Sequence, residues 1–278
     1  MQINTAVLNG NQYRYSFYPC QDSDQHVIFL LGALQEIESV DSFSKSFANK
    51  LNCITIEVPG TGLTQPLDST ISIRDQTSML LDLINYLGIN SAHVIGFSYA
   101  TAIAVELCDL WKNVLTLSIF GGVPGIPTSG RLATKKMIAA AMESPSDFAQ
   151  TFTQSLTINH PDIPRNNAII KATERGVAKL EQERIDVFFE NSVRLLVHTP
   201  SNIENISIPS TVCVGEYDPY VTTDIALEFA NKLKNSQFVV LKNADHLAHL
   251  QHPDKVAAIM IAQASSLIEL KKTLTSLT

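Results

Sequence analysis

The feature that most constrains this chain is a serine at a tight turn between a buried strand and a helix. An apolar run ends in Gly96-Phe97-Ser98-Tyr99-Ala100, and a helix-forming segment over 101–110 follows at once. Such a turn holds its serine in a strained backbone conformation, so the positions two residues before and after it must be small. Gly96 and Ala100 meet this demand. The pattern predicts that Ser98 is a nucleophile at the N-terminus of a helix, whose dipole favours developing negative charge.

An acid and a histidine follow the serine at the ends of two later strands. Apolar strands are predicted over 211–215 and 237–241; the first leads into Asp218 and the second into His246. Because ligands and catalytic groups gather at the carboxyl ends of strands in open α/β sheets, we expect the three side chains to meet. The histidine would take the serine proton, and the carboxylate would orient and stabilise the imidazolium. Ser98, Asp218 and His246 are therefore the predicted catalytic triad.

Two alternatives lie close to these residues in the sequence. Glu216 is a rival acid, but Asp218 falls later in its loop, where it can reach His246. His249 and His252 follow His246 at three-residue steps, a spacing that places histidines on one helical face and suits a metal site. However, the proline after His252 favours a helix start there, and no carboxylate–cysteine set completes a site. We therefore expect no metal and no cofactor.

Two backbone amides are predicted to form an oxyanion hole. An unbroken apolar run over 27–31, typical of a buried parallel strand, ends in Gly32-Ala33. The N–H of Tyr99, directly after the nucleophile, and the N–H of Ala33 are the expected donors. Losing one such donor typically raises the reaction barrier by roughly 3 kcal/mol.

Composition indicates one enzyme-sized chain that does not bind nucleic acid. The 278 residues carry a net charge of −7 and no run of lysines and arginines that would form a basic stripe. We expect no secretory signal, because the N-terminus lacks a basic region followed by an apolar stretch, and no run reaches the length of a membrane span. The four cysteines have neither metal nor redox spacing, so we expect reduced thiols and a cytoplasmic location.

The alternation of strands and helices is interrupted once. It runs from an N-terminal hairpin (6–8 and 13–18) to a strand over 114–120 and resumes at Thr211. Between them, 131–143, 147–156 and 171–198 are predicted to be helical without intervening strands. This organisation predicts a mostly parallel central sheet flanked by helices, formed by residues 1–123 and 201–278, with a helical cap over 124–200 inserted after the sixth strand. The remaining predicted elements are strands over 27–31, 53–58 and 93–95 and helices over 42–50 and 73–87.

The cap is expected to select the substrate. Its helices have apolar faces, which favour an apolar acyl or alkyl group over a charged ligand. Arginines are also spread through the cap, and we expect them to be solvated. An arginine at the pocket mouth would be a candidate contact for an anionic carrier such as a phosphopantetheine. These arginines are Arg131, Arg165, Arg175, Arg184 and Arg194.

Five separated loops together resemble the marker loops of the α/β-hydrolase superfamily. They are Leu31-Gly32-Ala33, Val58-Pro59-Gly60-Thr61-Gly62, Gly96-Phe97-Ser98, Gly215-Glu216-Tyr217-Asp218 and Ala244-Asp245-His246. The order serine, acid, histidine is also that of this superfamily. Within it, the spacing is similar to the bacterial 3-hydroxyacyl-carrier transferase and thioesterase group, which includes hydroxyalkanoyloxyalkanoate synthases. Members of that group usually carry a glycine pair after the nucleophile and a glycine before the histidine, where this chain has Tyr99-Ala100 and Asp245.

Three functions follow as hypotheses. The leading one is a serine hydrolase that cleaves an ester or thioester of an apolar acyl group through an acyl-enzyme at Ser98. The second is an acyltransferase that moves a (3-hydroxy)acyl group from a carrier thioester to an alcohol, with acyl-CoA or an acyl carrier protein as donor. The third is a ligand-binding protein that keeps the hydrolase fold without catalysis. Dehalogenase chemistry is disfavoured, because it needs a carboxylate where Ser98 stands.

Overall fold

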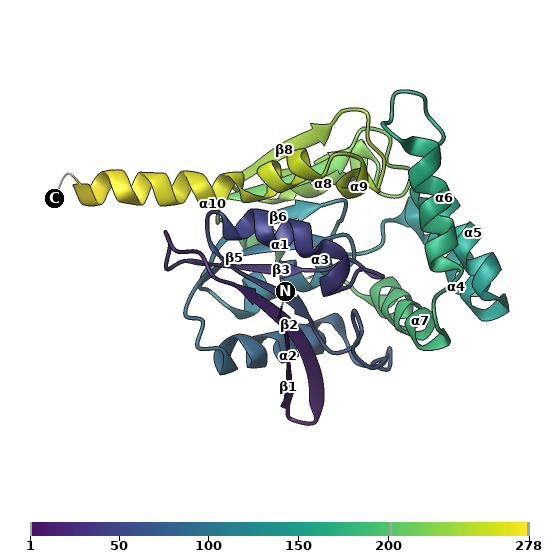
Figure 1. Ribbon diagram of the computed structural model, residues 1–278, viewed down its shortest axis with the longest axis horizontal. Helices are drawn as coiled ribbons and strands as arrows, with labels where there is room; N and C mark the ends of the chain where they lie inside the picture. The colour runs from purple at the N-terminus through teal and green to yellow at the C-terminus, as the bar shows by residue number, and fades with distance from the viewer. Residues whose placement is uncertain (1, 201, 277–278) are drawn as a thin grey trace.

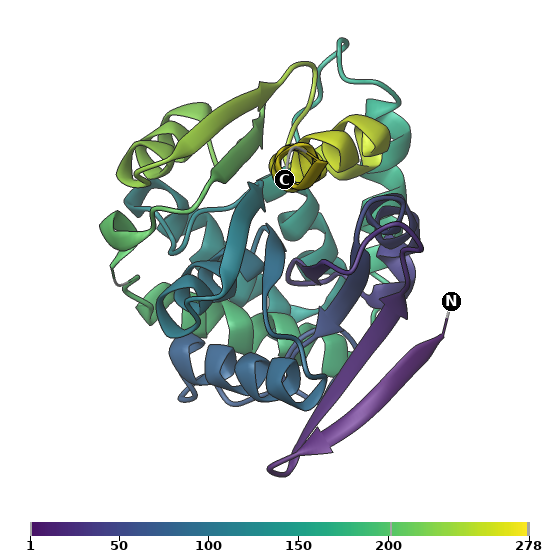
Figure 2. The same cartoon turned by 90° about the vertical axis from the view of Figure 1, so that its left-hand side faces the viewer.

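The computed structural model contains an eight-stranded sheet in the order β1-β2-β4-β3-β5-β6-β7-β8, with helices on both faces (Figures 1 and 2). It describes residues 2–200 and 202–276, with side chains up to residue 269. The six strands β4-β3-β5-β6-β7-β8, in their order across the sheet, pair in parallel. The β1–β2 hairpin adds two antiparallel strands at the edge beside β4. The strands are β1 (Ile3–Leu8), β2 (Asn11–Tyr18), β3 (His26–Leu30), β4 (Asn52–Glu57), β5 (Ala92–Phe97), β6 (Val114–Phe120), β7 (Ser210–Gly215) and β8 (Ser236–Leu241).

The central strands are apolar because helices cover them on both faces. Every residue of β5 and β7 is buried, as a parallel sheet between two helical layers requires. Local signals set the helix ends. Ser72 and Asp75 form a capping box at the start of α2, and Gly88 follows its end with a left-handed φ of +69°. These helices are α1 (Asp41–Ala48), α2 (Ile73–Tyr86), α3 (Ala100–Leu110), α8 (Thr223–Lys232), α9 (Ala248–Gln251) and α10 (Pro253–Ser276).

Four helices form the cap between β6 and β7: α4 (Arg131–Glu143), α5 (Pro145–Leu156), α6 (Asn166–Val177) and α7 (Gln182–Val197). They lie together at one end of the sheet (Figure 1). The prediction of one helical stretch over 171–198 is wrong. The chain turns after α6, where Lys179 N–H donates to the Gly176 carbonyl, and Glu181 is extended before α7 begins. The break lets α6 and α7 pack as separate helices.

Two arginines that were expected to be solvated instead fix α7 to the sheet domain. Arg194 is 1% exposed and donates to the carbonyls of Leu67 and Ile71, each over 2.6 Å. Arg184 is also buried, and its Nη2 lies 3.3 Å from Glu36 Oε1. Each guanidinium donates to acceptors on core loops. These acceptors would lose their partners if the arginine were solvated. The helix α7 is thereby held over the loops that follow β3 and β4.

Within the part of the chain that the structure describes, no helix combines the length and apolar character needed to span a membrane.

Candidate active site

Ser98 occupies the turn between β5 and α3 with a strained backbone. Its φ is +47°, a left-handed conformation that non-glycine residues seldom adopt outside functional sites. The Ser98 N–H donates to the Phe120 carbonyl over 2.8 Å, which ties the turn to the neighbouring strand. A Cβ atom on Gly96 would lie 3.2 Å from the Ala100 carbonyl oxygen, so a small residue is needed here, as the sequence predicts.

A second glycine that the sequence analysis missed also makes room for this turn. Gly122 follows β6, and a Cβ atom there would lie 2.0 Å from Thr101 Oγ1 and 2.6 Å from the Ser98 carbonyl oxygen. Only a glycine fits at these distances without a shift of the elbow. No local sequence signal marks this requirement, because the partner residues come from a different strand and helix.

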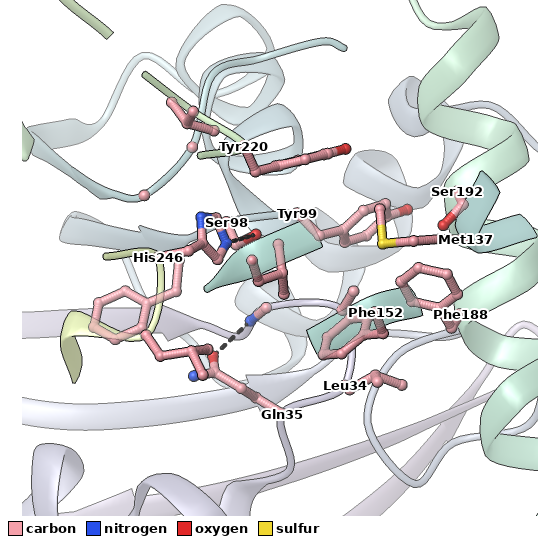
Figure 3. A pocket seen from close by; sticks show the side chains of 18 of the residues that line it. Leu34, Gln35, Ser98, Tyr99, Met137, Phe152, Phe188, Ser192, Tyr220 and His246 are labelled. Atoms are coloured by element: carbon pink, nitrogen blue, oxygen red, sulfur yellow. Dashed lines mark hydrogen bonds between the residues drawn. The ribbon is translucent and has the colours of Figure 1, made fainter. Parts of the chain in front are cut away.

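The structure brings the three predicted triad residues into one hydrogen-bonded chain. Ser98 Oγ lies 3.1 Å from His246 Nε2, and His246 Nδ1 lies 2.8 Å from Asp218 Oδ2 (Figure 3 shows the Ser98–His246 pair). The other carboxylate oxygen of Asp218 accepts the N–H groups of Tyr220 and Val221 over 2.9 and 2.8 Å. With both oxygens occupied, Asp218 is fixed in place. It can accept a hydrogen bond from the Nδ1–H of His246, which leaves Nε2 unprotonated and able to receive the proton of Ser98.

The environment of His246 favours its protonated form. Burial lowers the pKa of His246, but the charge and hydrogen bond of Asp218, together with the charge of Asp245, outweigh burial and raise the pKa above its usual value. The rival acid Glu216 makes no such contact. Its carboxylate instead pairs with Lys242 Nζ over 2.7 Å and accepts the Asn243 N–H over 3.1 Å. The structure therefore places Asp218, and not Glu216, against the imidazole.

The loop that follows β3 runs beside the serine, where the predicted oxyanion donors are required. Ala33 and Tyr99 line the same cavity as Ser98, and a Cβ atom on Gly32 would lie 3.5 Å from Ser98 Cβ. Gln35 holds this loop: its Oε1 accepts the Gly32 N–H over 2.8 Å, and its own N–H donates to the Gly32 carbonyl (Figure 3). The sequence analysis missed Gln35, whose role depends on this turn.

The other two histidines of the 246–252 segment lie in different surroundings. His249 lies in α9 and lines the cavity, whereas His252 follows α9 and its Nε2 contacts the Asn243 carbonyl oxygen over 2.9 Å. The three histidines therefore do not share one helix, in agreement with the sequence analysis. Within residues 2–200 and 202–276, no group of three or more His, Cys, Asp and Glu side chains could hold a metal ion.

Asp245 stands where a glycine was expected for the resembled group. It is fully buried, and Oδ1 accepts the Leu247 N–H over 2.8 Å and the side-chain amide of Gln251 over 2.7 Å. Its second oxygen accepts the Ile158 N–H, from the loop between α5 and α6, over 3.3 Å. Burial raises the pKa of Asp245 above its usual value. This carboxylate connects the histidine loop to the cap.

A cavity of about 400 Å³ lies between Ser98 and the cap. Apolar side chains dominate its walls, and Figure 3 shows Met137, Phe152 and Phe188 across the cavity from the Ser98–His246 pair. Among the residues that the structure describes, no lysine or arginine lines the cavity. Arg184 and Arg194 contact the core loops, so neither is free to meet an anionic carrier, whereas a contact by one of the other cap arginines stays a prediction.

Comparison with known proteins shows the family to which this chain belongs. The model of the Alpha/beta hydrolase family matches residues 29–259. A curated relative from Acinetobacter baylyi, an (E)-2-((N-methylformamido)methylene)succinate hydrolase, is 22% identical over 94% of this chain and 98% of its own length. Another from Pseudomonas putida, an (R)-3-hydroxydecanoyl-ACP:CoA transacylase, is also 22% identical, over 91% of this chain and 87% of its own length.

Solved structures share the fold over nearly the whole chain. The alpha/beta hydrolase enzyme MGS-M2 from a deep-sea metagenome superimposes with a TM-score of 0.82 at 16% identity, covering 94% of this chain and 96% of that one. The enol-lactonase from Burkholderia xenovorans gives a TM-score of 0.81 at 15% identity, covering 94% and 100%. Because the family model spans most of the sequence, the chain belongs to the alpha/beta hydrolase family and is an enzyme.

Proposed function

We propose that this enzyme is a serine hydrolase that cleaves an ester or thioester of an apolar acyl group. The observation that carries the proposal is the hydrogen-bonded chain from Ser98 through His246 to Asp218, which opens onto an apolar cavity. A strained serine with a free base nitrogen at 3.1 Å is arranged for nucleophilic attack.

The proposed reaction has two halves. Ser98 Oγ attacks the substrate carbonyl while its proton passes to His246 Nε2, and the N–H groups of Ala33 and Tyr99 stabilise the oxyanion. The C–O or C–S bond to the leaving group then breaks, and His246 returns the proton to the departing oxygen or sulfur. A water, deprotonated by His246, attacks the acyl-enzyme, and the carboxylic acid leaves as Ser98 regains its proton.

The cavity walls support an apolar acyl group. Predominantly apolar walls gain free energy from burying hydrocarbon, and a carboxylate there would lack a cationic partner among the described residues. The Acinetobacter baylyi relative is named for a succinate derivative, which carries two carboxylates. We therefore propose a different substrate class for this chain.

An acyltransferase is the second candidate. The Pseudomonas putida relative is named as a transacylase between an acyl carrier protein and coenzyme A, and the same triad serves both reactions when an alcohol or thiol replaces water. The cap over the cavity favours this alternative, because it can limit the access of water to the acyl-enzyme. Acyl-CoA or an acyl carrier protein would then be the donor.

Mass spectrometry of the intact protein tests both candidates. The protein is incubated with acyl esters and acyl thioesters of increasing chain length, and the expected result is acyl mass trapped on Ser98. Product analysis then separates water from an alcohol as acceptor. Ser98→Ala should lose both the trapped acyl group and labelling by a fluorophosphonate. Undiminished labelling of that variant would exclude Ser98, and an unlabelled native protein would favour the ligand-binding alternative.

We also propose the domain limits and the cellular location of this protein. We propose that residues 1–123 and 201–278 form the core and that 124–200 form the cap. A cytoplasmic location is proposed because the four cysteines carry free thiols, a state that the reducing cytoplasm maintains.

A further inference from the structure

His249 is a second imidazole in the cavity, and the proposed mechanism does not use it. It lies in α9, one helical turn beyond His246, and its ring centroid is 6.2 Å from those of both Phe97 and Phe120. Neither ring nitrogen has a hydrogen-bond partner within residues 2–200 and 202–276, yet the side chain lines the same cavity as Ser98. A polar side chain without a hydrogen-bond partner among the described residues thus lies in an aromatic site.

A histidine that only fills space inside a protein normally has its nitrogens paired, and this chain offers an example. Buried His93 places Nδ1 2.9 Å from Thr116 Oγ1 and Nε2 2.9 Å from Gln25 Oε1. The ring of His249 is half-buried at the cavity wall, so a substrate that displaces water from it leaves the ring nitrogens unpaired unless the substrate brings hydrogen-bonding groups of its own.

The charge of His249 limits which partner it can take. Burial, and then the neighbouring His246, lower the pKa of His249 to about 3, so the ring is neutral near pH 7. A neutral imidazole offers one N–H donor and one nitrogen acceptor. No lysine or arginine lines the described part of the cavity, so an anionic partner would lack a counter-charge. An uncharged group that both donates and accepts, such as an amide or a hydroxyl, matches the ring.

The position of His249 assigns it to one side of the reacting carbonyl. The cap side chains Met137, Phe152 and Phe188 lie across the cavity from the Ser98–His246 pair and form the apolar acyl side (Figure 3). Because His246 donates a proton to the leaving group, the leaving group has to lie beside the 246–249 segment.

We propose that His249 forms a leaving-group subsite that binds an amide or hydroxyl of the released alcohol or thiol. This inference rests on the proposed serine hydrolase function, and it adds a specificity-determining residue to that site. An amide or hydroxyl can donate to the free ring nitrogen or accept from the ring N–H. An alkyl leaving group would leave both unpaired.

Three octanoyl thioesters test the proposal. Their thiols are N-acetylcysteamine, which carries an amide, 2-mercaptoethanol, which carries a hydroxyl, and 1-butanethiol, which carries neither. In the native enzyme, kcat/KM for at least one polar thioester should exceed that for the butyl thioester. His249→Phe keeps an aromatic ring against Phe97 and Phe120 but has no hydrogen-bonding atom, and it should reduce this preference about tenfold, the effect of about 1.4 kcal/mol.

The controls separate this inference from the proposed function. His249→Gln restores a donor and an acceptor and should regain part of the preference, whereas His252→Phe makes the same replacement outside the cavity and should leave the preference unchanged. Fluorophosphonate labelling of Ser98 should persist in all three variants. If His249→Phe does not fold, His249→Leu gives the same comparison.

Two results would overturn the subsite. One is a native enzyme that labels at Ser98 but shows no preference for either polar thioester. The other is an equal change for all three thioesters in the folded His249 variant. Absence of labelling in the native enzyme would instead overturn the serine hydrolase itself.

Discussion

Asp245 directly precedes His246 in the chain, yet the imidazole bonds to Asp218, whose Oδ2 lies 2.8 Å from His246 Nδ1. The carboxylate of Asp245 is instead held by the Leu247 N–H and the Gln251 side chain. Two carboxylates therefore act on one imidazole, the first by a hydrogen bond and the second by its charge. Burial lowers the pKa of His246, and the charges of Asp218 and Asp245 raise it.

Asp245→Asn should shift the pH dependence of the reaction to lower pH. Asparagine keeps the size and an accepting oxygen but removes a negative charge that raises the pKa of His246. The pKa of His246 then falls, the ring stays neutral in more acidic solution, and the acidic limb of kcat/KM moves down. The pH profile with a p-nitrophenyl ester measures this shift. Asp254→Asn, an exposed carboxylate at the start of α10, is the control, and an acidic limb that stays or moves up contradicts the assignment.

Asp218→Asn should lower kcat far more than Glu216→Gln. The asparagine lacks the negative charge and can favour the wrong tautomer of His246, which in a comparable triad lowers kcat by about 10⁴-fold. Glu216 pairs with Lys242 and does not contact His246, so its amide variant should stay within a few-fold of the native rate, as expected for an ion pair with an exposed lysine. Turnover of a p-nitrophenyl ester by the two variants gives the ranking. The reverse ranking would transfer the role of acid to Glu216.

The sheet and its serine turn could be predicted because their signals are local. Continuous apolar runs mark strands that are buried on both faces, and small residues mark the turn at Ser98, whose φ is +47°. The placement of Asp218 after β7 and of His246 after β8 followed from the rule that parallel strands end at one edge.

The features that sequence reasoning missed depend on contacts between distant segments. Gly122 must be glycine because Thr101 and the Ser98 carbonyl lie against it. Arg194 on an amphipathic helix is typical of a solvated side chain, but the carbonyls of the 67–71 loop, with the side chains of Asn191 and Tyr99, make its burial favourable. Apart from Asn191, these partners lie between 21 and 127 positions away in the sequence, so no short stretch of the chain reveals them.

Arg194→Met should destabilise the fold strongly. Methionine fills part of the space, but the carbonyls of Leu67, Asp68 and Ile71 lose their donor inside the protein. Leaving a buried acceptor without its donor costs about 1–3 kcal/mol in free energy of unfolding for each group. Denaturant unfolding followed by circular dichroism measures the loss. Arg131→Met replaces an exposed cap arginine and should stay within about 0.5 kcal/mol, so equal losses would show that Arg194 has no special anchoring role.

Met137→Trp should shorten the range of acyl chains that the enzyme accepts. Met137 is 3% exposed, lines the cavity from α4, and lies across it from Ser98 (Figure 3). The larger indole should fill space that the distal part of a long acyl chain would occupy, while the carbonyl and the first carbons beside Ser98 are unaffected. We expect kcat/KM for p-nitrophenyl octanoate to fall about tenfold or more, and that for the acetate to change little, since each lost methylene contact is worth about 0.8 kcal/mol. Overpacking itself can cost about 1–3 kcal/mol of stability, so the melting temperature of the variant is measured beside the kinetics. An equal loss for both esters would mean that the cap side of the cavity does not hold the acyl chain.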